Sequence, residues 1–426
     1  MMAGNLLQQL YNIADTLIVG RFLGSGALAA VGSSFTLIIF LTSVILGLCM
    51  GSGTLLSMHW GAKDSESFQC AQAFSLLFIG SLTLLMTAGI LMFTDPIMGL
   101  LRIPEEIFTE TKTYLRIIFC GILFTFLFNY FAAALRSIGN SAVPLVFLSI
   151  ASVLNIVLDF LFILSFDMGI SGAAWATVTA QAVSAIGLSI YCLSGQPCLR
   201  LEKRHFSFHP LVWKNVIHFS LLTSMQQSIM NFGILLIQGL VNSFGVAVMA
   251  AFAAAVKIDA FAYMPVQDFG NAFSTFIAQN FGAGNHRRVR KSIRSALWVS
   301  MAFCLIISLL VWLFAKPLMG CFIQPEETEI ISIGVTYLHV EGAFYCGIGC
   351  LFLLYGFYRG IGQPGISILL TIISLGTRVV LAYCLAPTTI GLLGIWWAIP
   401  IGWILADLVG LLYYRKVCGK SLLPSA

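Results

Sequence analysis

Long apolar runs dominate this sequence, and each reaches the roughly 20 residues that a helix needs to cross a lipid bilayer. Hydrophobic residues make up 59% of the 426 positions and charged residues only 9%, whereas an average soluble domain carries about 25% charged residues. This composition excludes a soluble enzyme, and with a net charge of only +5 we expect no nucleic-acid partner. The twelve runs lie at 4–20, 27–58, 69–93, 113–135, 142–165, 171–193, 213–241, 246–281, 292–314, 330–358, 365–386 and 391–414. We therefore predict an all-α polytopic membrane protein with twelve transmembrane helices.

The basic residues between the runs predict the orientation of the chain. If both termini are cytoplasmic, fifteen Lys and Arg residues fall in inner loops and the tail, and five fall on the outer side. An excess of positive charge on the cytoplasmic side is the usual arrangement in membrane proteins. We therefore predict cytoplasmic termini, and we interpret the basic run from His286 to Arg294 as an orientation signal beside anionic lipid.

Short motifs recur along the chain at a nearly constant spacing of 221 to 223 positions. The matching segments begin at Trp60 and Phe281, Asp95 and Lys316, Pro104 and Pro325, Arg136 and Arg359, and Gly172 and Gly394. Such regularity indicates an internal repeat, and because each half holds six runs, both halves enter the membrane in the same orientation, as a parallel repeat. We predict an N-terminal lobe at 1–194, a cytoplasmic linker at 195–212 and a C-terminal lobe at 213–426.

The first predicted helix carries a carboxylate in its apolar middle. Gln8, Tyr11, Asn12 and Asp15 follow one another at i, i+3, i+4 and i+7, so they share one helical face. An ionised Asp at bilayer depth costs about 2.5–3.5 kcal/mol on insertion scales. Such a residue is expected to face a bundle interior or a wet cavity, where it pairs, takes up a proton or holds a cation.

The fifth predicted helix adds a second acid, because Asn155 and Asp159 lie four positions apart on one otherwise apolar segment, and Thr177 of the sixth helix offers a hydroxyl. Two acids in one low-dielectric site cannot both ionise cheaply. We therefore predict that Asp15 and Asp159 take up a proton or a monovalent cation, with hydrogen bonding between helices as the alternative interpretation. The repeat does not duplicate these acids, since the equivalent positions in the second half are both Leu.

The second half has polar residues of its own within its predicted helices. Lys257 and Asp259 are two positions apart and so do not face each other on a helix; we expect Lys257 to pair with Glu341, and Arg378 with Asp407. Structural pairing and a role with substrate are both open for the acids and the lysine. The candidates for substrate binding or gating in the two halves are Gln8, Tyr11, Asn12, Lys257, Asp259, Tyr263, Asp268 and Glu341.

Five segments together resemble one transporter family over essentially the whole chain. They are Asn5–Gly24 (NLLQQLYNIADTLIVGRFLG), Leu135–Ser141, Leu154–Ile163 (LNIVLDFLFI), Ala254–Asn285 and Tyr358–Pro364 (YRGIGQP). The chain resembles the multidrug and toxic compound extrusion (MATE) family of the multidrug/oligosaccharidyl-lipid/polysaccharide flippase superfamily, especially its bacterial branch named for DNA-damage-inducible protein F. This resemblance implies a V-shaped pair of six-helix lobes in the bacterial inner membrane that exports organic, often cationic, compounds against inward flow of H⁺ or Na⁺.

The resemblance also implies a cation site in the first lobe. Relatives use an Asp of helix one, an Asn-x-x-x-Asp pair of helix five and a Thr of helix six, and the matching positions here are Asp15, Asn155, Asp159 and Thr177. A Na⁺ held by the first three is the one metal ion we expect, and no cofactor is expected beyond H⁺ or Na⁺ as the coupling ion. We expect a monomer whose partners are small organic molecules and the lipid bilayer.

Two departures from the family pattern accompany these matches. Relatives begin with some two dozen more residues, so we expect the first helix to be shorter at its inner end. One branch carries an acid on helix seven where this chain has Gln226 and Gln227, so we expect no Na⁺ site there.

Two other functions compete with an antiporter. A flippase for a lipid-linked oligosaccharide needs a basic cavity for its pyrophosphate, whereas the intramembrane charges here are more acidic than basic. An intramembrane aspartyl protease resembles this chain only in having paired acids; such enzymes carry Tyr-Asp and Gly-x-Gly-Asp motifs, but this chain has Ala14-Asp15 and Leu158-Asp159. We therefore predict a transporter and not an enzyme.

Overall fold

A computed structural model describes residues 2–100, 103–207 and 209–419 of the chain. Within these ranges, the side chains at 2–7, 9, 10, 12, 13, 25, 36, 100, 235 and 417–419 are outside the description. Every regular element of the described chain is a helix. By its contacts the chain divides into two compact units, Met1–Ser224 and Met225–Ala426, which we call the first and second unit. The lobe boundaries at 194 and 213 stay a prediction.

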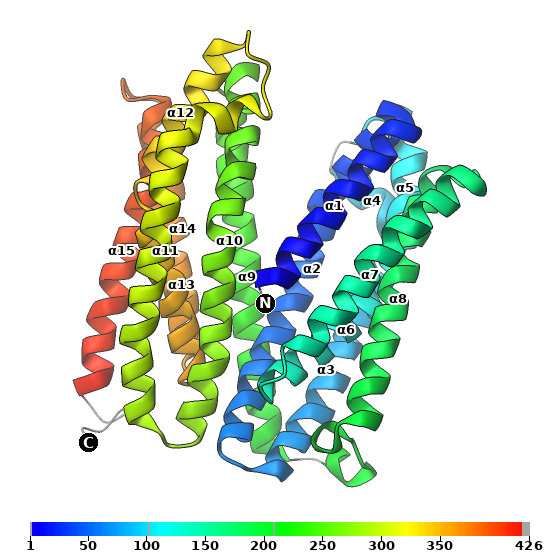
Figure 1. Ribbon diagram of the computed structural model, residues 1–426, viewed down its shortest axis with the longest axis vertical. Coiled ribbons are helices and arrows are strands. Elements are labelled where there is room, and N and C mark those ends of the chain that lie inside the picture. Colours follow the sequence, from blue (N-terminus) through cyan, green and yellow to red (C-terminus); the bar gives the residue numbers. More distant parts are fainter. Residues whose placement is uncertain (1, 101–102, 208, 420–426) are drawn as a thin grey trace. The chain divides into compact units, whose positions relative to one another are not determined.

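Long helices that run side by side build the first unit (Figure 1). In chain order its elements are α1 (Met2–Phe22), α2 (Gly24–Gly61), α3 (Ser65–Met92), α4 (Thr94–Leu100), α5 (Glu105–Cys120), α6 (Ile122–Ser137), α7 (Ala142–Phe160), the π-helical turn η1 (Leu161–Ser165), α8 (Gly169–Gly195) and the 3-10 turns η2 (Pro197–Leu199) and η3 (Lys203–Phe206). α2 packs against α3, α5 and α6, while α7 packs against α1 and α8. The long helix α9 (Pro210–Asn242) begins in this unit, where Trp213 stacks on Phe74 with ring centroids 3.8 Å apart.

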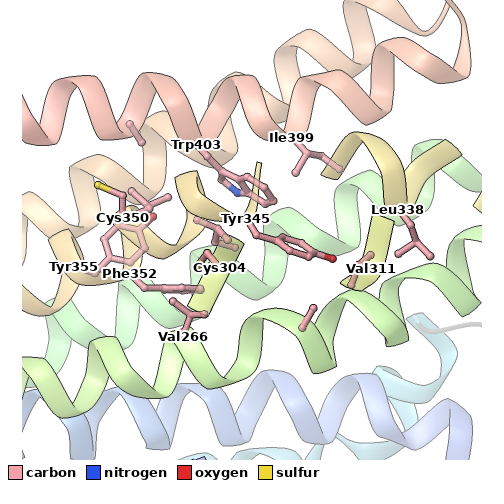
Figure 2. Packing of buried hydrophobic residues seen from close by; sticks show 14 of the residues in the cluster. Val266, Cys304, Val311, Leu338, Tyr345, Cys350, Phe352, Tyr355, Ile399 and Trp403 are labelled. Carbon is pink, nitrogen blue, oxygen red and sulfur yellow. The ribbon is translucent and has the colours of Figure 1, made fainter. Parts of the chain in front are cut away.

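The second unit repeats this pattern with the last six helices. They are α10 (Val246–Gly282), α11 (His286–Gly320), α12 (Thr328–Gly342), α13 (Tyr345–Gly360), α14 (Pro364–Leu385) and α15 (Leu392–Gly419). Its core is rich in aromatic residues: Figure 2 shows Tyr345, Phe352 and Trp403 packed with Val266 and Cys304. These large aromatic side chains bury much apolar surface against one another, and this packing holds the helices of the second unit together.

The helices account for the predicted membrane spans. Eight helices of the described chain are long and apolar enough to cross a bilayer. Two more spans come from pairs that are bent at a short break, α5 with α6 by 41° and α12 with α13 by 52°. α1 and α9, with 21 and 33 residues, bring the number to the twelve that were predicted.

The helix bounds confirm the internal repeat. α2, α3, α5, α6, α7 and α8 recur as α10, α11, α12, α13, α14 and α15, with first residues 221 to 223 positions apart. Even the turns are repeated: Gly139 after α6 and Gly362 after α13 have φ values of 90° and 85°. A side chain with a Cβ is strained in this left-handed region, so Gly is the natural choice at both turns.

The backbones of α10 and α13 touch where they cross in the second unit. A Cβ added at Gly356 would lie 2.3 Å from the carbonyl oxygen of Gly270, and one added at Gly270 would lie 2.7 Å from that of Phe352. Only residues without a side chain fit there. At the corresponding crossing of α2 and α6, Gly53 faces Ala133, and a Cβ on Gly53 would lie 3.0 Å from the Ala133 methyl group.

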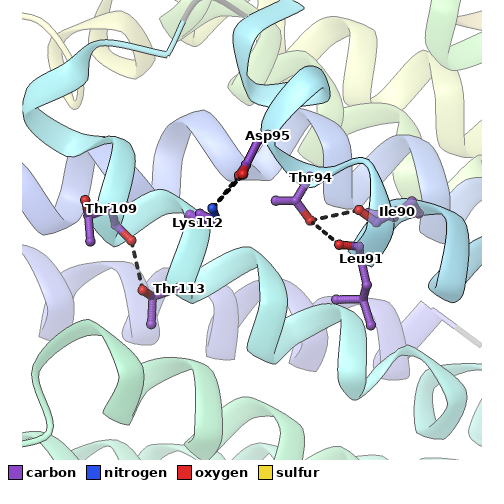
Figure 3. A network of polar contacts seen from close by, with 7 residues as sticks. All are labelled: Ile90, Leu91, Thr94, Asp95, Thr109, Lys112 and Thr113. Atoms are coloured by element: carbon purple, nitrogen blue, oxygen red, sulfur yellow. Dashed lines mark hydrogen bonds and ion pairs between the residues drawn. The ribbon is translucent and has the colours of Figure 1, made fainter.

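Polar contacts join the short helix α4 to α5 and to the end of α3 (Figure 3). Lys112 of α5 forms an ion pair with Asp95 of α4 at 2.6 Å, and the Thr94 hydroxyl donates to the carbonyl oxygen of Ile90 at 2.8 Å. Because the ion pair is partly exposed, it contributes at most about 1 kcal/mol.

Candidate functional site

Two helices of the first unit bring the predicted acids together. Asp15 lies on α1 and Asp159 near the end of α7, and α1 packs directly on α7. Asp159 is fully buried, and its carboxyl group is close enough to that of Asp15 for the two to interact directly. Each helix carries one acid, and the contact between the two helices brings the two carboxyl groups together inside the unit.

The oxygens of this carboxyl pair lack protein partners. Both carboxylate oxygens of Asp159 and Oδ1 of Asp15 are buried without a hydrogen bond to any described residue, and so is Oδ1 of Asn155. Asn155 uses its Nδ2 to donate to the Thr177 hydroxyl at 3.3 Å, which leaves its carbonyl oxygen free to accept. Buried polar groups normally have a partner. The arrangement therefore presents carboxylate and amide oxygens of the type that bind protons and hard cations.

A small cavity of about 60 Å³ adjoins the carboxyl pair through Asn155. It is lined by Gln8, Tyr11, Thr125, Phe128, Asn129, Leu148, Ala151, Asn155, Thr177, Ala180, Gln181 and Ser184. A buried water needs roughly 10–15 Å³ of such space, so the cavity has room for a few waters or a hydrated ion. Organic ligands occupy sites of about 300 Å³ or more, so this cavity is too small for them.

Several polar residues of this wall were not predicted. The Thr125 hydroxyl donates to the Gln181 side chain at 2.7 Å, and Asn129 donates to the Thr125 carbonyl oxygen at 2.8 Å. Gln181 follows Thr177 by four positions and Asn129 follows Thr125 by four, so helical periodicity could have found both pairs. Tyr114 of α5 is also buried next to both acids, but no pattern in its own helix distinguishes it.

The other predicted residues of α1 have different positions. Tyr11 is half-buried and interacts with Gln8 and Gln181, while Gln8 itself is exposed. The side chain of Asn12 lies outside the described residues.

The backbone of α7 changes immediately after Asp159. The helix ends at Phe160 and continues as a π-helical turn, η1. Such single π turns are rare and occur frequently at functional sites. The corresponding helix of the second unit, α14, is α-helical throughout its range, Pro364–Leu385.

The second unit has a buried polar cluster of its own. Asp259 of α10 accepts a hydrogen bond from the Tyr345 hydroxyl of α13 at 2.6 Å. Glu341 of α12 interacts with Asp259 and with Tyr337, and Arg378 of α14 lies close enough to act on both carboxyl groups. The cluster thus combines two acids with an arginine and tyrosine hydroxyls.

The two predicted pairings in this unit are wrong. Lys257 is exposed, whereas Glu341 is buried beside Asp259. Residues two positions apart point to nearly opposite sides of a helix, so Lys257 points away from the face that carries Asp259. Arg378 acts on the Asp259 and Glu341 pair, and Asp407 of α15 contacts the Cys350 thiol.

Two further candidates of α10 are buried within the second unit. Asp268 lies in the middle of the helix and is 5% exposed. Tyr263 is half-buried near Asp259 and Glu341, and its ring packs against Phe352.

Comparison with known proteins decides the family. The MatE family model matches residues 1–161 and 222–384. A relative in Bacillus subtilis (strain 168), the probable multidrug resistance protein YpnP, is 31% identical over 429 residues, covering 99% of this chain and 94% of YpnP. The chain belongs to the MatE family.

This MatE protein is similar to other relatives over almost its whole length. The probable multidrug resistance protein NorM of Thermotoga maritima is 24% identical, with 93% of this chain and 86% of NorM covered. A solved structure of a MOP superfamily transporter from Pyrococcus furiosus has a TM-score of 0.93 and 25% identity, covering 100% of this chain and 95% of the other. A structure of MATE in the bent conformation has a TM-score of 0.92, with coverage of 98% and 93%.

These similarities confirm the predicted family and fold class of the MatE protein. It is a multi-pass membrane protein with the duplicated helical fold of MATE transporters. The roles of the candidate residues stay predictions.

Proposed function

We propose that this MatE protein is a secondary antiporter that exports organic, cationic and amphipathic compounds in exchange for H⁺ or Na⁺ by alternating access. One observation carries the proposal: the carboxyl groups of Asp15 and Asp159 interact in the interior of the first unit while their buried oxygens lack protein partners. Two ionised carboxylates in that position repel each other, and uptake of a proton or a Na⁺ relieves the repulsion.

Binding of the coupling ion changes how α1 and α7 hold together, because each helix contributes one of the two acids. A cation shared by Asp15 and Asp159 draws the helices together, and its loss leaves two like charges in contact. The ion shifts the balance between two conformations only by the difference in its affinity for them. Each tenfold difference in affinity contributes about 1.4 kcal/mol to that shift.

In this proposal the small cavity holds the coupling ion and its waters. Its 60 Å³ does not admit an organic substrate, but its polar wall of Tyr11, Gln181 and Thr125 suits a hydrated ion or a chain of waters leading to the acids. A cationic substrate is favoured while the pair is ionised and is disfavoured once the pair has taken up its ion. This opposite dependence couples export of one cation to import of the other.

A flippase for a pyrophosphate-linked lipid is less well supported. The described residues lining the cavity include no Lys or Arg, and the nearest ionisable side chains are acids.

The experiment compares two Asp→Asn variants in proteoliposomes loaded with ethidium. Asp159→Asn keeps the volume of the side chain but removes its charge, and we expect gradient-driven efflux to fall at least tenfold. Asp167→Asn is the matched control, because the same change is made at an exposed residue whose φ of 50° Asn tolerates equally well; efflux should stay within about twofold of wild type.

Imposing a pH gradient and a Na⁺ gradient separately identifies the coupling ion. Wild-type efflux that ignores both gradients, or an Asp159→Asn variant that exports at the wild-type rate with the same ion dependence, would rule out the proposed coupling. Cleavage of a model transmembrane peptide by the wild type, lost in Asp159→Asn, would indicate a protease instead.

A further inference from the structure

A groove of about 600 Å³ runs between α10 and α11 of the second unit, two helices that lie side by side (Figure 1). Its lining residues are Phe269, Ala272, Phe273, Phe276, Arg288, Lys291, Ser292, Ser295, Ala296 and Val299. Its size is within the range of sites that hold small molecules. None of the residues lining the groove is an acid, and nothing in the proposed antiport uses it.

The polarity of the groove changes steadily along α11. Arg288, Lys291, Ser295 and Val299 lie at i, i+3, i+7 and i+11, so they share one helical face. At 1.5 Å per residue they extend over about 16 Å. Along this distance the groove passes from two cations through a hydroxyl to apolar side chains. An amphiphile with an anionic head and a hydrocarbon chain has the same sequence of polarity.

The apolar end of the groove continues into exposed apolar surface of α11. Val299 is 57% exposed, and Ile306, Leu310 and Leu313, which follow it at helical spacing, are 59%, 45% and 56% exposed. On a membrane-spanning helix such a stripe faces lipid. Trp298, 69% exposed beside the groove, is the residue type that membranes favour at the interface between headgroups and hydrocarbon.

The two cations at the other end are not neutralised by acids. Neither Arg288 nor Lys291 takes part in an ion pair with a described residue. The Arg288 guanidinium lies over the Phe276 ring, 5.3 Å from its centroid, which holds it at the wall of the groove. Both residues also belong to the first turns of α11, where the helix dipole adds positive potential.

We propose that this groove binds one anionic phospholipid, with its phosphate on Arg288 and Lys291 and an acyl chain along Phe269, Phe273 and Val299. In the predicted topology the basic end of α11 is cytoplasmic, so the lipid comes from the inner leaflet. Charge complementarity selects an anionic headgroup, and the apolar groove selects a lipid over a soluble anion. The basic run from His286 to Arg294, which also predicts the orientation of the chain, thus contains a binding site for the lipid headgroup.

The test is a lipid titration of the full chain in detergent, followed by native mass spectrometry. Phosphatidylglycerol and phosphatidylcholine with identical acyl chains are compared, and we expect the wild type to bind one phosphatidylglycerol at least tenfold more tightly. A basic residue near an anionic lipid surface is worth roughly a fivefold change in binding. The double variant Arg288→Gln with Lys291→Gln should therefore lose about ten- to thirtyfold in phosphatidylglycerol affinity and most of the headgroup selectivity.

The matched control is Arg287→Gln with Arg294→Gln, which removes two exposed charges from the same helix but from outside the groove. We expect this control to keep the selectivity within about twofold. A third variant, Ala272→Phe, fills the apolar part of the groove and keeps both cations, so it should weaken phosphatidylglycerol binding at least fivefold. Circular dichroism and thermal melting establish that each variant is folded.

Three results would overturn the proposal. Equal binding of the two lipids by the wild type would show that the headgroup is not recognised. Equal loss in the two double variants would show a diffuse effect of net charge. Complete competition by millimolar glycerol phosphate, with Ala272→Phe binding as tightly as wild type, would assign the cations to a soluble phosphate.

Discussion

Each unit of the molecule buries a pair of carboxyl groups, but the two pairs have different surroundings. In the first unit, Asp15 and Asp159 have buried oxygens without protein partners, beside a small cavity and a π-helical turn. In the second unit, Asp259 accepts a hydrogen bond from Tyr345, and Arg378 acts on both Asp259 and Glu341. The buried oxygens of the first pair lack described partners, whereas the second pair has a tyrosine hydroxyl and an arginine beside it, with Oε1 of Glu341 and Nε of Arg378 still lacking a hydrogen bond.

This difference shows what the duplication kept and what it did not. Helix bounds, bent pairs and turn glycines are repeated between the units, but neither acid pair is. Positions 15 and 159 correspond to Leu236 and Leu381, and position 259 corresponds to Ile38. We therefore expect the first pair to govern ion coupling and the second to govern stability.

The most direct test of this difference between the two acid pairs is to make the same substitution in both units. Asp15→Asn should lower gradient-driven ethidium efflux at least tenfold and leave the melting temperature almost unchanged, because the buried Oδ1 of Asp15 makes no hydrogen bond to a described residue. Asp259→Asn should lower the melting temperature and leave the dependence of efflux on the imposed gradient intact. If Asp259→Asn abolished ion dependence while Asp15→Asn did not, the assignment of the two pairs would be reversed.

Removing the arginine of the second unit should have the next largest effect. Arg378→Met removes the positive charge that acts on both Asp259 and Glu341, and we expect a loss of stability of roughly 1–3 kcal/mol. Thermal unfolding in detergent measures the loss. Adding Glu341→Gln to Arg378→Met should recover part of the stability, since one of the two uncompensated acids is then neutral; purely additive losses would contradict the coupling.

A smaller difference in stability is expected between Tyr→Phe substitutions at two buried tyrosines. Tyr345→Phe removes the hydroxyl that donates to Asp259, and loss of a hydrogen bond to a charged group costs about 1.5–3 kcal/mol. Tyr114→Phe is the control in the first unit, because the Tyr114 hydroxyl is close to the acids but donates no hydrogen bond to a described residue. We expect its unfolding temperature to stay near the wild-type value.

The smallest effect concerns the equivalent loops that precede α3 and α11. Asp64 caps α3 by accepting from the Ser67 backbone N–H at 3.0 Å, and Asn285 caps α11 by accepting from that of Arg288 at 3.2 Å. Hydrogen bonds from Ser67 hold the pKa of Asp64 below its ordinary value. Its stabilising contribution is therefore fully present at neutral pH and is lost as the pH falls below about 4.

Alanine at either cap should cost about 1 kcal/mol or less at pH 7. Thermal melts of Asp64→Ala should approach those of the wild type as the pH is lowered, whereas the difference caused by Asn285→Ala should not depend on pH. Asp64→Asn should retain the cap at every pH, as Asn does in the second unit.

The sequence predicted the fold better than it predicted pairings between helices. Apolar length and the 221-residue spacing specify the spans and their duplication, and helical periodicity places Asn155, Asp159 and Thr177 on inward faces. Periodicity alone does not tell which neighbouring helix a face meets. The predicted pairing of Arg378 with Asp407 failed for that reason, because Arg378 acts on Asp259 and Glu341 instead. Lys257 does not pair with Glu341 because it is exposed, on another side of α10 from Asp259.

The closely packed glycines of α10 and α13 bear on how the second unit can move. With Gly270 and Gly356 in backbone contact, a shift of either helix along the other by one residue, about 1.5 Å, would force main-chain atoms into each other. We therefore expect α10 and α13 not to slide along each other and to move together. Because Asp259 lies on α10 and Tyr345 on α13, we expect their hydrogen bond to be kept when these two helices move together.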